Sequence, residues 1–256
     1  MRIGSVAATA RMALVILMAL TAVASAAEIK VWSGGAFRPV MNELGPRFER
    51  TAGHKLVIEY AASPVFLKRI GTGETFDVAI LLPETIDGWI KEGKIISDTR
   101  INIGRAALGV AVRAGASKPD MSSADALKRT LLAANTVSYS PDGGVGKHFA
   151  FVLERLAIAA DMKSKLRPVA AGGASPGFVA KGEAEIAIAL IPAILSTPDV
   201  QLAGPFPSEF AYYVDLSAGV STSAKEPEAA KALVKLLGAP DGIAVIKAKG
   251  FERVAP

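Results

Sequence analysis

The feature that most constrains the fold is a short apolar strand that runs into a turn of small residues and then into a helix. Its first copy spans residues 31–39 (VWSGGAFRP) and places Pro39 in the first turn of the expected helix. Proline is tolerated there because an N–H in the first turn has no partner within the helix. Small side chains leave nearby backbone N–H groups open at the positive end of the helix dipole. The turn therefore predicts a seat for an anion.

The chain offers this kind of turn four times. The second copy follows the expected strand 55–60 and carries Ser63, and the third ends near Gly146. The fourth holds Gly172 and Gly173. Strand and helix signals alternate between these turns at a spacing typical of parallel pairing, which predicts an open α/β sheet. Two groups of elements, each with two such turns, predict two similar α/β lobes.

We expect a hinge of two strands between the lobes. A strand predicted at 105–112 leaves the first group of elements, and a strand predicted at 211–220 brings the chain back. The first lobe is therefore predicted to comprise residues 27–110 and 211–256, and the second lobe residues 111–210. Ligands of open α/β sheets bind beyond the carboxyl ends of the strands, where the small turns lie. The expected ligand site is a cleft between the lobes.

Three finer predictions concern segments next to the turns. The spacing of apolar residues predicts a helix over residues 39–50 and another over residues 147–159. The glycines of segment 143–146 are expected to form a turn before the second of these helices. Segment 201–210 contains prolines that interrupt any regular element, so we expect it to be a broken connection.

The first 26 residues predict a cleaved secretory signal. Arg2 and Arg11 supply a positive n-region, and the apolar run 12–23 is too short to span a bilayer. The small residues 24–26 fit a signal-peptidase site, so the mature protein is expected to begin near Ala27. The expected location is the periplasm or the cell exterior.

Composition narrows the chemistry of the site. The chain has no cysteine and only two histidines, His54 and His148, which excludes a disulfide framework, a thiol nucleophile and a histidine-rich zinc site. Without Arg2 and Arg11 the formal net charge falls from +5 to +3, and the basic residues are spread along the chain. A nucleic-acid partner would require a basic stripe. We therefore expect a small anionic ligand, no nucleic-acid partner, and neither a metal nor a cofactor.

Five segments, in a specific order, carry a resemblance to a known family. They are the opening turn, 60–63 (YAAS), 76–80 (FDVAI), 181–188 (KGEAEIAI) and 226–231 (EPEAAK). From Ile29 to Phe251 the sequence resembles the ModA-type periplasmic substrate-binding proteins, a type 2 branch of the binding proteins of ABC importers. The resemblance implies a monomer that closes two lobes on a small oxyanion of the molybdate or tungstate type. It also implies delivery of that ligand to an ABC permease in the inner membrane.

The predicted ligand-binding residues come from the turns and from the resemblance. The resemblance places a second-turn serine on Ser63 and a first-turn serine on Ala36. Its backbone donors fall near Gly146 and near residues 172–173, and a tyrosine of the molybdate binders falls on Leu190. Two hydroxyl donors of the family are therefore replaced. The full predicted set is Ser33, Gly34, Gly35, Ala36, Arg38, Ser63, Gly146, Lys147, Gly172 and Gly173.

Arg38 and Lys147 introduce a second ligand hypothesis. Each lies in the first turn of an expected helix, where the dipole disfavours a cation and a ligand charge would compensate. A guanidinium binds a carboxylate in a bidentate way, so a small organic carboxylate held by Arg38 is the alternative to a tetrahedral oxyanion. For Lys147, a side chain that turns to solvent explains the position at least as well.

An enzyme is the competing class. Ser63, His148 and Asp142 can be arranged into a hydrolytic set, but no nucleophile-elbow motif accompanies them. We therefore predict a binding protein without catalytic residues and keep a periplasmic hydrolase as the remaining alternative. A ligand-sensing partner of a membrane receptor would use the same lobes, and the sequence does not separate it from a transport component.

Overall fold

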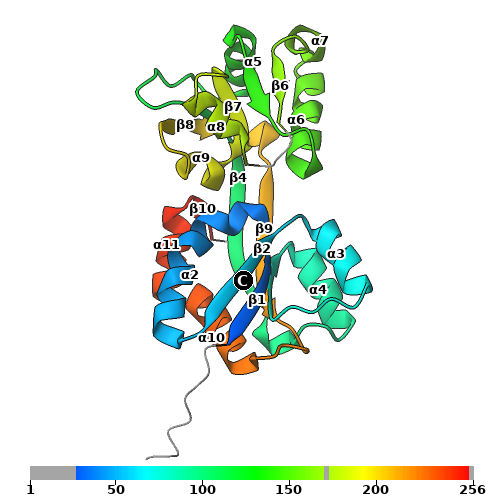
Figure 1. Cartoon of the computed structure of the whole chain (residues 1–256). Helices are drawn as coiled ribbons and strands as arrows, with labels where there is room; N and C mark the ends of the chain where they lie inside the picture. The colour runs from blue at the N-terminus through cyan, green and yellow to red at the C-terminus, as the bar shows by residue number, and fades with distance from the viewer. Residues whose placement is uncertain (1–26, 170–172, 254–256) are drawn as a thin grey trace, which may run out of the picture.

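The computed structural model describes residues 27–169 and 173–253. The predicted signal segment 1–26 and the predicted site residue Gly172 lie outside these ranges. Figure 1 shows two lobes of mixed α/β structure, one above the other, with two strands passing between them. This arrangement confirms the predicted fold class. The predicted boundaries near residues 110 and 211 stay a prediction.

The first lobe is built on a central sheet of largely buried strands. Its strands follow the order β2-β1-β3-β9-β4. β1, β2 and β3 pair in parallel, whereas β9 is antiparallel to β3 and to β4. β3 is buried along its whole length, as expected of a strand covered on both faces. The bounds are β1 (Glu28–Ser33), β2 (Lys55–Tyr60), β3 (Val78–Leu81), β4 (Ile101–Arg113), β9 (Tyr213–Val220) and a short β10 (Phe251–Glu252), which pairs with β4.

Alternate residues of these strands supply two separate cores. Val31 packs on one face with α2, α10 and α11, whereas the next residue, Trp32, packs on the other face with α3 and α4. Figure 1 shows these two helix groups on opposite sides of the sheet. The period-2 alternation of side chains along a strand explains this division. The helices are α2 (Arg38–Ala52), α3 (Ser63–Gly71), α4 (Pro83–Lys91), α10 (Pro227–Gly238) and α11 (Pro240–Ala248), with 3-10 turns η1 (Gly35–Phe37) and η2 (Ser97–Thr99).

β4 is the strand that joins the two lobes. Its residues up to Ala107 pair with β9, and its residues from Leu108 onward pair with β7. The second lobe continues the same sheet in the order β4-β7-β5-β6, and β8 also pairs with β4. Its elements are α5 (Ala124–Ala133), β5 (Val137–Tyr139), α6 (Gly143–Arg155), α7 (Ala159–Met162), β6 (Leu166–Pro168), α8 (Ser175–Ala180), β7 (Ile186–Leu190), α9 (Ile191–Leu195), β8 (Val200–Pro205) and η3 (Ser208–Phe210).

The pairing directions determine where the strand-to-helix turns lie. β3 and β4 are both antiparallel to β9, so β3 runs toward the second lobe, and β1 and β2 run with it. β7 is antiparallel to β4 and parallel to β5, which is parallel to β6, so these three strands run toward the first lobe. The carboxyl ends of the two strand sets therefore face each other. We call the space that they face the interlobe region.

Two predicted segments differ from the structure. The predicted helix 147–159 begins at Gly143 and ends at Arg155, and a separate short helix, α7, follows. Gly144 and Gly146 therefore lie inside the first turn, where close packing outweighs their low helix propensity, whereas Gly143 opens the helix at a φ of +73°. Segment 201–210 was predicted to be broken, yet residues 200–205 form β8 on the edge of β4. A proline at the end of an edge strand removes no ladder hydrogen bond, which explains why Pro205 does not prevent this pairing.

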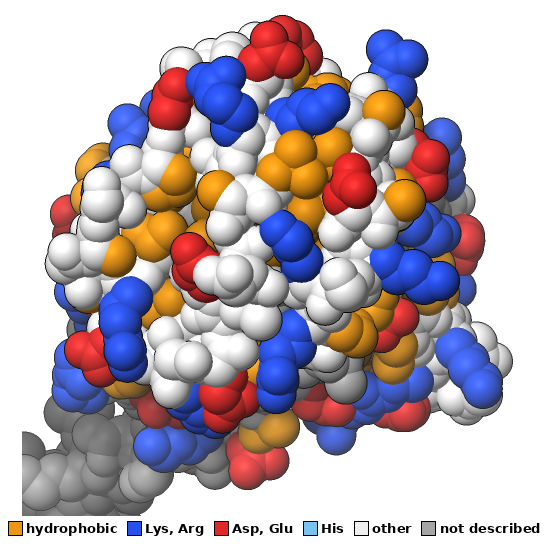
Figure 2. Space-filling view, turned by 90° about the horizontal axis from the view of Figure 1, so that it is seen from above, with side chains coloured by type: hydrophobic (Ala, Val, Ile, Leu, Met, Phe, Trp, Pro, Cys, Tyr) orange, Lys and Arg blue, Asp and Glu red, His pale blue; other side chains and the backbone are white. Residues whose placement is uncertain are grey.

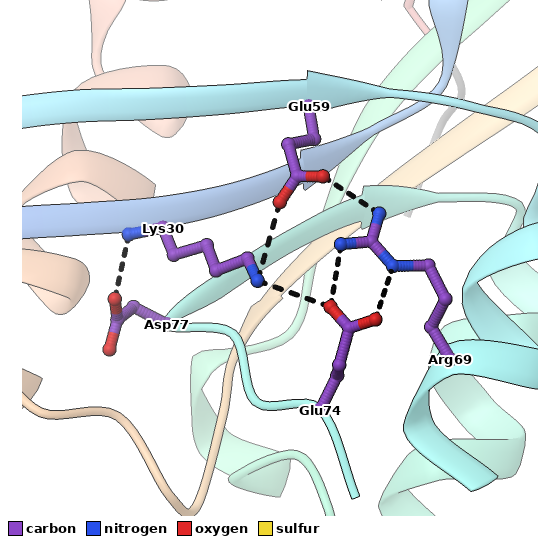
Figure 3. A network of polar contacts seen from close by, with 5 residues as sticks. All are labelled: Lys30, Glu59, Arg69, Glu74 and Asp77. Atoms are coloured by element: carbon purple, nitrogen blue, oxygen red, sulfur yellow. Dashed lines mark hydrogen bonds and ion pairs between the residues drawn. The ribbon is translucent and has the colours of Figure 1, made fainter. Parts of the chain in front are cut away.

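A charged network braces the outer part of the first lobe. Lys30 Nζ lies 3.3 Å from Glu59 Oε1 and 3.4 Å from Glu74 Oε2, and Arg69 contacts the same two carboxylates (Figure 3). Arg69 also lies 5.1 Å from the ring centroid of Trp32. The network thus ties together β1, β2, α3 and the loop before β3, directly above the aromatic core of that face.

Candidate functional site

The first turn of the interlobe region is largely closed on itself. Ser33 is fully buried, and its Oγ donates to the Gly34 carbonyl at 3.2 Å. The Gly34 N–H donates to the Ile80 carbonyl at 2.9 Å, which ties the turn to β3. Two of the predicted donors are therefore engaged within the protein. Gly35 and Ala36 begin η1, and N–H groups at the start of a helix have no partner inside it, so these two remain as donors.

Arg38 brings the first and second turns together. Its guanidinium carbon lies 3.8 Å from the centroid of the Tyr60 ring, and Tyr60 is the last residue of β2. Burial raises the pKa of the Tyr60 phenol, and the Arg38 charge partly opposes that rise. The Arg38 side chain is exposed, and no carboxylate of the described residues forms an ion pair with it. Ser63, the first residue of α3, is 7% exposed at the end of the same turn.

The third turn, at the start of α6, is tightly packed. Gly146 is buried, and a Cβ on it would lie only 2.6 Å from the Ser140 carbonyl oxygen. Ser140 itself is 5% exposed, and its Oγ has no hydrogen-bond partner among the described residues. Buried polar groups in proteins are nearly always paired, so this hydroxyl calls for an explanation. Lys147 is exposed in the first turn of α6.

Sequence reasoning missed Ser140. The available signal was a serine at the carboxyl end of a strand, directly before a glycine-rich helix start. The same pattern had drawn attention to Ser33 in the first turn, where the hydroxyl is already engaged. The structure therefore separates two serines that look alike in the sequence.

The fourth turn contributes mainly internal contacts. Gly173 is exposed and has a φ of +87°, a conformation that favours glycine. Ser175 Oγ donates to the Ile188 carbonyl, and Ser138 Oγ donates to the Ser175 carbonyl, both at 2.9 Å. Leu190 ends β7 and packs against the cores of both lobes. Its position at this junction is filled by apolar packing.

The residues of the hydrolytic alternative make other contacts. His148 Nε2 is 2.9 Å from the Phe210 carbonyl oxygen, and the imidazole stacks on the Tyr212 ring. Asp142 is the N-cap residue of α6, and its side chain forms no cap hydrogen bond. Among the described residues, no hydrogen bond joins Ser63, Asp142 and His148.

A cavity of about 560 Å³ lies elsewhere in the second lobe. It is bounded by the end of β4, by α5 and by α8, and none of the predicted site residues lines it. Within residues 27–169 and 173–253, no three histidine, aspartate or glutamate side chains gather to hold a metal ion. In the same ranges, no helix has both the length and the hydropathy needed to cross a bilayer.

The surface of the molecule mixes both signs of charge. Figure 2 shows one end of the molecule, on which Lys and Arg side chains lie between Asp and Glu side chains. Charges interspersed in this way give no continuous basic stripe on that described face. The net positive charge is therefore distributed rather than concentrated there.

Two α/β lobes joined by two strands, with helix starts at facing strand ends, define a two-lobed solute-binding protein with the type 2 periplasmic binding protein fold. The chain belongs to the bacterial extracellular solute-binding protein family, whose model matches residues 29–252. Within that family it is similar in sequence and in fold to ModA-type substrate-binding proteins.

Three known proteins illustrate the range of its relatives. The chain is 28% identical over 232 residues to an aconitate isomerase from Pseudomonas sp, with 88% of each chain covered. It is 27% identical over 238 residues to the molybdate-binding protein ModA of Azotobacter vinelandii, which covers 91% of this chain and 92% of ModA. The solved periplasmic molybdate-binding protein of Azotobacter vinelandii superposes with a TM-score of 0.70 at 18% identity, over 89% of this chain and 100% of that one.

Proposed function

We propose that this protein is a periplasmic solute-binding protein that captures a small organic carboxylate between its lobes and delivers it to an ABC permease. The observation that carries the ligand class is the exposed Arg38 guanidinium, stacked on Tyr60 beside the interlobe region. A guanidinium presents paired N–H donors that match the two oxygens of a carboxylate. The Tyr60 ring supports one face of the guanidinium and leaves its N–H edge available.

The engaged donors of the first turn support the same ligand class. A tetrahedral oxyanion held without a counter-cation depends on hydroxyl and backbone donors that point at it. Here Ser33 and Gly34 donate within the protein, and Ala36 and Leu190 carry no side-chain donor. An oxyanion of the molybdate or tungstate type remains the second candidate, because the ModA relative spans 91% of this chain.

We also propose that the protein binds its ligand without turning it over. The family membership supports a binding role, and the described part of the site contains no hydrogen-bonded nucleophile and base. The aconitate isomerase relative motivates a direct test of this point. When cis-aconitate is incubated with the purified protein, the proton NMR spectrum of the cis-aconitate should stay unchanged. Appearance of trans-aconitate in proportion to protein concentration would replace the binding role with an enzymatic one.

A ligand panel tests the proposed function. The melting temperature of the protein should rise in the presence of the true ligand, because a ligand that binds only the folded state stabilises that state. The panel comprises molybdate, tungstate, sulfate, phosphate, succinate, citrate and trans-aconitate. A rise with one of the carboxylates and none with the oxyanions is expected. A rise confined to molybdate and tungstate would transfer the assignment to the second candidate and keep the fold.

Arg38→Ala should separate the two ligand candidates. If a carboxylate is bound by the guanidinium, calorimetry should show its Kd rising by roughly 30- to 100-fold, because a charge-assisted bidentate pair is lost. A backbone-bound oxyanion would be affected by less than about threefold. Arg47→Ala is the matched control, since Arg47 lies on the same helix and pairs with Glu43. Equal losses in the two variants would contradict a specific role for Arg38.

A further inference from the structure

Tyr212 lies where the chain returns from the second lobe to the first. Its carbonyl oxygen accepts a hydrogen bond of 2.9 Å from the Leu108 N–H, at the point where β4 changes partners. In Figure 1 α6 stands beside these connecting strands. The backbone of Tyr212 therefore belongs to the hinge, and only its side chain can reach either lobe.

The Tyr212 ring is turned toward the start of α6. Its hydroxyl lies against Gly144, in the first turn of that helix, at a place where any Cβ on Gly144 would overlap the phenol oxygen. His148 holds the ring in this orientation. The two rings stack with centroids 4.8 Å apart and an interplanar angle of 23°, and His148 Nε2 is 2.9 Å from the Phe210 carbonyl oxygen.

The Tyr212 hydroxyl has no hydrogen-bond partner among the described residues. The side chain is half-buried, and its oxygen is not among the buried side-chain atoms that lack a partner, so the hydroxyl stays accessible to solvent or to a ligand. Burial raises the pKa of the phenol, and the carboxylate of Glu84, at the start of α4 in the first lobe, raises it further. The Tyr212 hydroxyl therefore lies beside the first turn of α6 and within electrostatic range of Glu84 in the first lobe.

We propose that the Tyr212 hydroxyl is a ligand-binding donor of the interlobe site, and that it selects ligands with a second carboxylate. The inference rests on the proposed function. A bidentate pair with Arg38 uses both oxygens of one carboxylate, and Arg38 lies on the first lobe. A further donor beside α6, in the second lobe, therefore needs a further acceptor on the ligand. The substrate class that follows is the small di- and tricarboxylates.

The test compares succinate with butyrate, which has the same number of carbons and one carboxylate fewer. We expect calorimetry of the wild-type protein to show at least a tenfold preference for succinate. Tyr212→Phe should raise the Kd of succinate about tenfold and leave that of butyrate unchanged. Tyr213→Phe is the matched control, because Tyr213 is an adjacent exposed tyrosine whose ring stacks with Arg105. It should behave as the wild type does.

A double-mutant cycle with Gly144→Ala tests the placement of the hydroxyl. In the wild-type background the new Cβ displaces the phenol oxygen, so succinate binding should weaken by at least tenfold. In the Tyr212→Phe background that oxygen is absent, and the next ring atom, Cζ, lies 3.1 Å from the new Cβ. Gly144→Ala should then add less than a threefold loss. Melting temperatures of all variants check that each one is folded.

The possible failures are distinguishable. If the wild type binds succinate and Tyr212→Phe binds it within twofold of the wild type, the inference about Tyr212 is wrong and the proposed function stands. If Tyr212→Phe weakens succinate and butyrate equally, the selection of a second carboxylate is wrong. If the wild type binds no carboxylate of the panel, the proposed ligand class fails and this inference fails with it.

Discussion

The first turn of lobe one and the third turn, in lobe two, are built from similar residues and arranged differently. In the first turn, Ser33 Oγ donates to Gly34, and the Gly34 N–H donates to Ile80, so the turn is fastened internally. In the third turn, Ser140 Oγ is buried without a partner among the described residues, and Gly146 packs against the backbone before α6. The serine hydroxyl of the first turn is therefore used within the protein, whereas the serine hydroxyl of the third turn has no partner among the described residues.

This difference shows that a small-residue turn is not a ligand site by composition alone. What matters is whether the neighbouring strand uses the donors of the turn. β3 lies beside β1 and its Ile80 carbonyl accepts from the Gly34 N–H, whereas the Arg38 guanidinium at the same turn stacks on Tyr60. Each lobe carries both a cation and a hydroxyl near these turns: Arg38 and Ser63 in the first lobe, and Lys147 and Ser140 in the second.

The largest expected effect comes from glycine substitutions, which test whether the third turn is packed more tightly than the first. Gly146→Ala should lower the unfolding free energy by roughly 2–3 kcal/mol, because the added Cβ overpacks α6 against residues 140–141. Gly35→Ala in the first turn should change it by less than about 0.5 kcal/mol, since no atom lies within 4 Å of the Cβ position. Urea unfolding of the two variants measures this directly. Equal destabilisation would contradict the difference in packing.

Substitutions of Ser33 and Ser140 should have smaller effects, and they test which of the two hydroxyls is used within the protein. Ser33→Ala should lower the unfolding free energy by about 1 kcal/mol through loss of its internal hydrogen bond, with ligand affinity unchanged. Ser140→Ala removes no hydrogen bond to a described residue, so its unfolding free energy should match that of the wild type within about 0.5 kcal/mol. Its Kd for the tightest-binding anion of the panel should rise roughly five- to tenfold. If Ser33→Ala instead weakened ligand binding and Ser140→Ala instead lowered the unfolding free energy, the first turn would be the ligand-binding one and the third the structural one.

The smallest effect concerns the charged network of the first lobe. Hydrogen bonds from Arg69 hold the pKa of Glu74 at about 2, below its ordinary value of 4.5. A depressed carboxyl pKa stabilises the fold above the unfolded-state value, and this contribution is lost as the pH falls from about 4.5 toward 2. As the pH falls over this range, the stability of the Glu74→Gln variant should therefore decrease less steeply than that of the wild type. Urea midpoints of the two proteins should converge near pH 2, where the carboxyl becomes protonated in the folded wild type as well.

Much of the fold was predictable because it depends on local patterns. Apolar runs of strand length alternated with helical spacing, and proline at helix starts marked the boundaries. β2 and the first turn were found in this way, and the two-lobed α/β class is confirmed. The start of α6 was misplaced because Gly143 and Gly144 disfavour a helix locally. In the structure Gly143 opens the helix at a φ of +73°, and Gly144 packs against the Tyr212 hydroxyl.

The candidate site was less predictable because it depends on distant contacts. The engagement of Gly34 requires Ile80, and the orientation of Tyr212 requires His148 and Gly144, which are far away in the sequence. Arg38 was identified from its position at a helix start, but its stacking on Tyr60 was visible only in the structure. Sequence patterns located the turns, and tertiary contacts decided which of their groups are available.

The first lobe is built from two parts of the chain that are far apart in the sequence, and this affects the order in which the chain folds. Its main core joins Val31 and Phe37 to Phe251, and the rings of Phe37 and Phe251 are 5.6 Å apart. Among the described residues, the buried side chains of the second-lobe cores lie between residues 108 and 210, and Tyr212 packs against one of these cores. A chain that emerges from its amino end can complete the second lobe while the first still waits for its last helices. Truncation near the carboxyl end should thus leave a folded second lobe attached to an open, aggregation-prone first one.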